Sequence, residues 1–144
     1  TVPAKGKYDD LDTERFVKKH GIDFNFNSHF PINTLNLMRG AVYAKENGFF
    51  EDYVKVIFKS MWVDNKKMDE LDVIKTVLEE NKLPAQRIFE GTQDQNIKSK
   101  LIENTAKAVE DGLFGVPSFL IDNELFFGKE TLQDVEDLIK DKVA

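Results

Sequence analysis

Cysteine is absent from the 144 residues of this chain. Its absence excludes disulfide bonds, a thiolate nucleophile and zinc–thiolate sites within these residues. Basic residues are also fewer than acidic ones. The chain has 20 lysines and arginines and 26 aspartates and glutamates, and its formal net charge is −6. Such a chain offers no basic field to nucleic acid or to an acidic membrane surface. We therefore expect no nucleic-acid partner and no membrane partner.

Long apolar runs are missing as well. None approaches the roughly 20 residues that span a bilayer, and no signal peptide precedes Thr1. The hydrophobic content of 41% and the charged content of 32% favour one ordinary globular core with a soluble surface, and we expect a cytoplasmic protein. Because Thr1 is not a methionine, we expect that residues upstream of it have been lost. Histidine is scarce, and we expect no metal site.

Apolar residues recur at helical spacing from the start of the chain to about Gly112. The clearest example is the stripe from Phe50 to Trp62, in which apolar residues return every three or four positions. A short alternating stretch, 22–26, predicts a half-buried strand. Further helices are expected over 10–20, from a cap at Asn33 to Gly48, from a cap at Asp69, from Leu83-Pro84, and over 92–111.

The pattern changes after Gly112. The runs 119–121 and 125–127 are dense in large apolar residues, and Asp122-Asn123 between them predicts a two-residue hairpin turn. A start resembling a capping box at Thr131 then opens a last helix. We accordingly divide the chain into a helical part, 1–112, and a C-terminal part, 113–144.

Four stretches of the chain occur in the order seen in one enzyme family. They are Val2-Pro3-Ala4-Lys5-Gly6-Lys7-Tyr8, His29-Phe30-Pro31-Ile32-Asn33-Thr34-Leu35, Phe114-Gly115-Val116-Pro117-Ser118-Phe119 and Glu124-Leu125-Phe126-Phe127-Gly128. Over nearly its whole length the chain resembles the 2-hydroxychromene-2-carboxylate isomerases. These enzymes are related to kappa-class glutathione transferases and to DsbA-like disulfide oxidoreductases.

The resemblance implies an α/β fold that is mostly helical, namely a thioredoxin-like domain interrupted by an all-helical insertion. Residues 1–112 match the insertion lobe, and residues 113–144 match the C-terminal half of the thioredoxin-like domain. In the family, an opening strand, helix and strand carry a serine that faces the sulfur of glutathione. We expect that segment to lie before Thr1, and we assign no residue of this chain a catalytic role.

The resemblance also implies a glutathione site beside a proline loop. In thioredoxin-like relatives, a cis peptide at the position of Val116-Pro117 turns the backbone N–H and C=O of the first residue outward, where they pair with a peptide-like ligand. The positions of Lys129 and Glu130 hold the γ-glutamyl end, at a helix start that suits a carboxylate. Here Glu130 replaces a shorter aspartate, and a lysine precedes it. A trans-proline strand entry and an acidic residue that only favours the helix dipole are the structural alternatives.

Four further residues are candidates for the site or for catalysis. Lys5 matches a family lysine beside the glutathione pocket, where it could meet the glycyl carboxylate or an anionic substrate, and a solvated lysine is the alternative. Trp62 and Tyr8 are candidates for a substrate pocket, although helical spacing makes Trp62 a core residue first. His29 is a candidate general base, but its place before Phe-Pro favours a loop histidine bonded to backbone.

The resemblance therefore predicts a fragment of a glutathione-dependent isomerase, with glutathione as cofactor and a small aromatic or unsaturated substrate. A DsbA-like thiol–disulfide oxidoreductase with an upstream Cys-x-x-Cys is one alternative, and a non-catalytic interaction module is another. We also expect a homodimer, because a lone apolar hairpin is marginal and its unpaired edges favour association.

Overall fold

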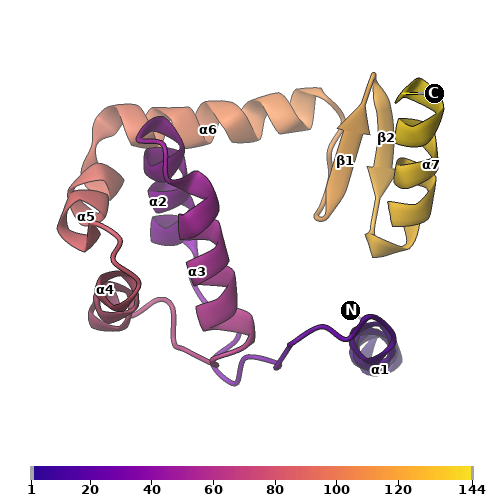
Figure 1. Cartoon of the computed structure of the whole chain (residues 1–144), viewed down its shortest axis with the longest axis horizontal. Coiled ribbons are helices and arrows are strands. Elements are labelled where there is room, and N and C mark those ends of the chain that lie inside the picture. Colours follow the sequence, from indigo (N-terminus) through magenta and orange to yellow (C-terminus); the bar gives the residue numbers. More distant parts are fainter. Residues whose placement is uncertain (1, 144) are drawn as a thin grey trace. The chain divides into compact units, whose positions relative to one another are not determined.

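The structure is a computed structural model that describes residues 2–143. By its internal contacts the chain divides into two compact units, Thr1–Lys98 and Ser99–Ala144 (Figure 1). The first unit is helical, and the second carries a β-hairpin. The expected mostly helical α/β class is confirmed. The sequence change at Gly112 marks where helix gives way to hairpin, whereas the compact units divide at Lys98.

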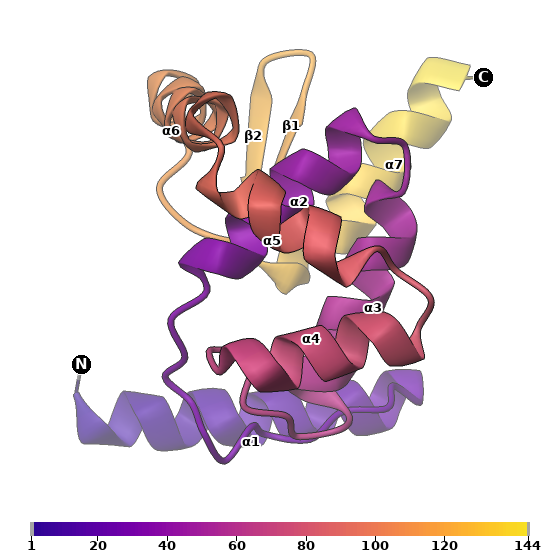
Figure 2. The ribbon, with the colours of Figure 1, turned by 90° about the vertical axis from the view of Figure 1, so that its left-hand side faces the viewer.

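Five helices lie in the first unit and a sixth starts there. They are α1 (Pro3–His20), α2 (Leu35–Glu46), α3 (Phe50–Trp62), α4 (Leu71–Glu80), α5 (Ala85–Gln93) and the start of α6 (Gln95–Glu110). Helix α2 packs against both α3 and α5, and α4 packs against α3 and α5 (Figure 2). These four helices therefore build the core of the unit.

Helix boundaries follow local chemistry, with three departures from the sequence prediction. Helix α1 ends at Gly21, which has φ 61° as a left-handed cap, but it begins at Pro3 rather than at residue 10, because proline is well tolerated in the first turn. The helix predicted over 92–111 is interrupted at Asp94, whose carboxylate accepts the N–H groups of Asn96 and Ile97 and so starts α6 anew. Asp69 does not cap α4, which follows Glu70.

The predicted strand at 22–26 is wrong. This segment is extended but pairs with no strand in the described part of the chain. Instead, the Asn25 N–H donates to the carbonyl of Trp62 at 2.6 Å, and the Phe24 ring stacks on the Trp62 indole with centroids 5.8 Å apart. The alternating pattern thus marks a chain segment with one side against the end of a helix.

Two tyrosines organise the helical core. Tyr53 of α3 is 2% exposed and donates its hydroxyl to the carbonyl of Leu37 at 2.9 Å, and its burial raises its pKa above the ordinary value. Its ring lies against Gly40 of α2, while Tyr43 of α2 lies against Gly91 of α5. The buried apolar core of this unit consists of Leu37, Ala44, Tyr53, Ile57, Met61, Met68, Ile74, Val77, Leu78, Ala85 and Ile88.

Parts of the predicted apolar faces stay in solvent. On α3 the central positions of the stripe are buried, but Phe58 is 63% exposed and Phe50 is 41% exposed. On α2 the inward residues are Leu37, Gly40 and Ala44, whereas Met38 is exposed. The close approach of α2 to Tyr53 of α3 turns the small residue Gly40 toward the core.

The second unit contains the predicted hairpin. Strands β1 (Ser118–Ile121) and β2 (Glu124–Phe127) are antiparallel, with Ser118 opposite Phe127 and Ile121 opposite Glu124. Asp122 and Asn123 have φ 47° and 69°, as a two-residue hairpin turn requires. A short 3₁₀ turn, η1 (Lys129–Thr131), leads into α7 (Leu132–Val143), whose Lys142 forms an ion pair with Asp122 of the hairpin turn.

We predict that Gly40→Ala destabilises the first unit. An alanine Cβ would lie 2.8 Å from Tyr53 Cζ and closer still to its hydroxyl, so a buried ring would have to move. The free energy of unfolding should fall by about 1–3 kcal/mol, as for other overpacked cores. Urea denaturation followed by circular dichroism measures it.

Gly6→Ala is the matched control, because a Cβ there meets nothing within 4 Å in helix α1. This variant should be neutral or gain up to about 1 kcal/mol from helix propensity. Equal stability of the Gly40→Ala variant and the parent would contradict the close approach of α2 and α3.

Candidate functional site

The proline loop lies between α6 and the hairpin. Its Val116-Pro117 peptide is cis, which confirms the prediction. Val116 is 90% exposed, and neither its N–H nor its C=O hydrogen-bonds to another group in the described part of the chain. A second cis peptide, Phe30-Pro31, was not anticipated. The loop therefore presents one free backbone edge to solvent.

Three contacts hold the proline loop in place. The hydroxyl of Ser118 donates to the carbonyl of Gly115 at 2.6 Å, and the N–H of Gly128 donates to the carbonyl of Pro117 at 2.9 Å. Gly115 itself lies against the ring of Phe127, with no room for a side chain. The Gly128 bond brings the loop directly beside the start of η1. It joins the two segments that the sequence assigned to glutathione.

Lys129 and Glu130 form an ion pair at this junction. Gly128 has φ 92°, and the Glu130 carboxylate folds back over it, because a Cβ built on Gly128 would lie 2.6 Å from Oε2. The hydroxyl of Thr131 donates to the carbonyl of Gly128 at 2.9 Å instead of capping the helix as expected. An ammonium and a carboxylate thus lie side by side next to the proline loop.

The other sequence candidates lie in the first unit. Lys5 and Tyr8 are on α1, both side chains exposed, with Tyr8 at 58%. Trp62 is half-buried at the end of α3 and lies between Phe24 and Phe30, whose ring centroids are 5.8 and 5.9 Å from the Trp62 ring. Trp62 is therefore part of an aromatic cluster. Lys5 and Tyr8 belong to the first unit and the proline loop to the second.

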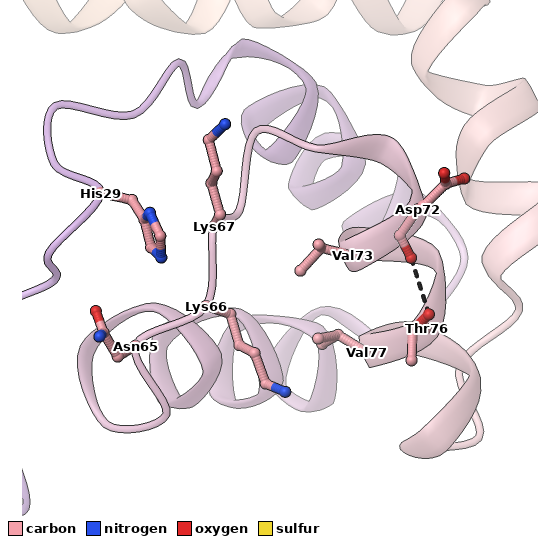
Figure 3. Close-up of a pocket in the computed structure, with 8 residues that line it drawn as sticks. All are labelled: His29, Asn65, Lys66, Lys67, Asp72, Val73, Thr76 and Val77. Atoms are coloured by element: carbon pink, nitrogen blue, oxygen red, sulfur yellow. Dashed lines mark hydrogen bonds between the residues drawn. The ribbon is translucent and has the colours of Figure 1, made fainter.

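Sequence reasoning missed a pocket in the first unit. His29 lines it together with Lys66, and Figure 3 shows the imidazole directed into the space between the two loops and α4. The His29 side chain was expected to bond to backbone, but no such hydrogen bond is present among the described residues; the backbone N–H of His29 donates to Oδ1 of Asn27 at 2.8 Å. The signal that could have found the pocket is weak, since its residues come from three separate segments.

Among residues 2–143, no group of three histidine, aspartate or glutamate side chains is arranged to hold a metal ion. No helix in this part of the chain has the length and apolarity to cross a bilayer.

A model of the DsbA-like thioredoxin domain matches residues 1–140. The chain belongs to this family. Two relatives are named 2-hydroxychromene-2-carboxylate isomerase. That of Pseudomonas putida is 25% identical over 132 residues, which cover 91% of this chain and 64% of the relative. That of Sphingobium xenophagum is 23% identical over 133 residues, which cover 90% of this chain and 66% of the relative.

A solved structure agrees with this DsbA-like assignment. A 2-hydroxychromene-2-carboxylate isomerase matches 99% of this chain and 69% of its own with a TM-score of 0.87 at 21% identity. At that identity the match shows the fold. The expected resemblance to this group of proteins is confirmed, and the chain spans just under two thirds of the length of the two relatives.

We predict that Gly115→Ala displaces the proline loop of this DsbA-like chain. The new Cβ would lie 2.8 Å from Cε2 of Phe127, so either the ring or the loop has to shift. The hairpin should lose about 1–2 kcal/mol of stability, seen as faster amide exchange in β1 and β2. A second change, Phe127→Leu, makes room and should restore part of the protection. Unchanged exchange in Gly115→Ala would show that the loop is not packed on Phe127.

Proposed function

We propose that the protein is a glutathione-dependent isomerase that acts on 2-hydroxychromene-2-carboxylate or a related small aromatic or unsaturated acid, and that these residues hold its glutathione. One observation carries the proposal. The Gly128 N–H bonds to the Pro117 carbonyl, so the free backbone edge of Val116 lies beside the Lys129–Glu130 ion pair. The names of the two relatives supply the reaction.

The backbone edge of Val116 suits a peptide-like cofactor. Its N–H and C=O are exposed and unused, and a ligand backbone can pair with both as an added strand does. The cysteinyl unit of glutathione carries the complementary C=O and N–H. The loop is fixed by Ser118 and by Gly128, so little ordering is lost on binding.

The ion pair suits the other end of the same cofactor. The γ-glutamyl unit ends in an ammonium and a carboxylate on one carbon, which matches a carboxylate beside an ammonium. Glu130 would accept the amine and Lys129 would meet the carboxylate, in exchange for their present bond to one another. Both side chains are partly exposed, so the net gain per contact is small.

The chemistry proposed for the bound state is reversible addition. When bound, glutathione supplies a thiolate that adds to an activated double bond of the substrate, permits rotation and leaves again, with no net change in atoms or electrons. The residues described here orient the cofactor through its backbone and its charged end. We place the reaction in the cytoplasm, where reduced glutathione is held.

Thiol–disulfide exchange is the second candidate, because the family description is DsbA-like. The two relatives named as isomerases favour the first. A redox role would need a protein thiol, and the 144 residues contain no cysteine.

The binding proposal predicts that glutathione binds more tightly than cysteinylglycine, which lacks the γ-glutamyl unit. Glu130→Gln should weaken glutathione about threefold to tenfold while leaving cysteinylglycine unchanged, because only the first ligand presents an ammonium there. Isothermal titration with reduced glutathione and with cysteinylglycine measures the two affinities.

Glu124→Gln is the matched control, since Glu124 lies at the far end of β2 beside the hairpin turn. It should bind glutathione like the parent. Equal affinities for the two ligands, or an unchanged affinity in Glu130→Gln, would contradict the assigned role of the ion pair.

We further propose that the protein forms a homodimer through one face of the hairpin. Leu120 and Leu125 are opposite one another on that face with Phe127 beside them, and their exposures are 41%, 37% and 44%. Their neighbours on the other face, Phe119 and Phe126, are half-buried. An exposed apolar strand pair favours association with another chain.

Sedimentation velocity tests this proposal. The parent should sediment as a dimer at about 10–50 μM, and Leu120→Lys should shift it to monomer, because a charge would have to be buried in the interface. Glu124→Lys, on the opposite face, should leave the dimer intact. A monomeric parent in this range would refute the dimer.

A further inference from the structure

Phe114 is an exposed aromatic residue two positions before Val116, at the start of the proline loop. It is 73% exposed, although large apolar side chains gain free energy by burial. Its ring contacts the ring of Phe127, with centroids 4.6 Å apart and planes tilted by 44°. The Phe114 ring is thus packed on one side, while most of its surface is open to solvent.

Hydrogen bonds fix the backbone on both sides of Phe114. The N–H of Leu113 donates to the carbonyl of Ala108 at 2.9 Å, where α6 ends. The carbonyl of Gly115 accepts the hydroxyl of Ser118 at 2.6 Å. Because the chain is held before and after Phe114, the exposed ring is positioned in advance, and little ordering is lost when a ligand covers it.

The aromatic pair adjoins the backbone edge that the proposed function assigns to glutathione. A Cβ built on Gly115 would lie 2.8 Å from Cε2 of Phe127, so this ring packs directly on the residue before Val116. Val116 itself is almost fully exposed, and its N–H and C=O have no partner among the described residues. A ligand paired with Val116 therefore binds next to an aromatic surface.

The chemistry of this surface favours a planar aromatic ring. Aromatic rings attract one another in tilted or offset arrangements, beyond the effect of the area that they bury. A ring packed on Phe114 would also remove exposed apolar surface of the protein from water. A small aliphatic group covers less of this surface, and a charged group would lose its own hydration there.

We propose that Phe114 determines the specificity of the site, by packing against the aromatic ring of the molecule that reacts with bound glutathione. This inference rests on the proposed function, because glutathione paired with Val116 is what brings the second molecule to this surface. The Phe114 ring makes the contact, and Phe127 supports it from the other side. Neither ring takes part in making or breaking bonds.

Two thioethers of glutathione test the proposal by isothermal titration. S-Benzylglutathione carries a ring on its sulfur, in place of the substrate, whereas S-methylglutathione has the same peptide backbone without the ring. The parent should bind the benzyl thioether about fivefold more tightly than the methyl thioether. Phe114→Ala should reduce this preference below about twofold and leave the affinity for the methyl thioether unchanged. Phe114→Tyr keeps a ring and should retain the preference.

Phe58→Ala is the matched control, because Phe58 is another exposed phenylalanine and lies on α3 in the first unit. It should keep the preference of the parent. If neither thioether binds the parent, the proposed function fails and this inference fails with it. If both bind the parent equally, or if Phe114→Ala keeps the preference, the glutathione site stands and the role of Phe114 is overturned. An equal loss of both affinities in Phe114→Ala would also overturn it, since the ring would then only hold the loop.

Discussion

The close contact of two tyrosine rings with two glycines is the constraint on which the helical unit depends. Tyr53 of α3 needs the bare backbone of Gly40 on α2, and Tyr43 of α2 needs that of Gly91 on α5. Because each ring packs on a glycine, the two helices lie closer together than a residue with a Cβ would permit. The Tyr53 hydroxyl donates to the carbonyl of Leu37, which is also on α2. A buried phenol without that acceptor would cost about as much as a lost hydrogen bond. One contact thus buries the Tyr53 ring and gives its hydroxyl a hydrogen-bond acceptor.

This packing sets the position of the segment before α2 and of the loop after α3. At the end of α3, the carbonyl of Met61 accepts a hydrogen bond from the Asn27 side chain, and the carbonyl of Trp62 accepts one from the Asn25 N–H. The extended segment before α2 is thereby attached to the end of a helix instead of a sheet. The pocket beside His29 exists because this attachment leaves a space that side chains from α4 line but do not fill.

In the second unit, backbone hydrogen bonds take the role that apolar burial has in the first. Within the described part of that unit, Val135 is the one buried apolar side chain. The Gly128–Pro117 bond and the Ser118–Gly115 bond therefore carry much of the local order of the proline loop. A site built on backbone groups tolerates changes of side chain, which fits a chain that keeps the DsbA-like fold at 21% identity to its structural match.

The sequence predicted what local chemistry determines. Asp122 and Asn123 tolerate positive φ, so the hairpin turn and its register could be read directly, and Gly21 and Gly112 marked real helix ends. The resemblance located the proline loop and the Lys129–Glu130 segment, and the structure brings these two together. Prediction failed where the deciding contact is distant. Phe24 and Phe26 alternate like a strand, but Phe24 stacks on Trp62, and Asn27 bonds to carbonyls 34 and 39 residues away.

The pocket lined by His29 and Lys66 also could not be predicted from the sequence. No spacing in the sequence links His29 to Lys66 or to Val73, because three separate segments contribute them and helix packing sets their distance. A lysine among many others also carries no local mark of being unpaired. Only the fold shows that Lys67 has a carboxylate in reach while Lys66, the adjacent residue, has none among residues 2–143. Alternate residues of a loop face different ways, so one of two adjacent lysines reaches a carboxylate and the other does not.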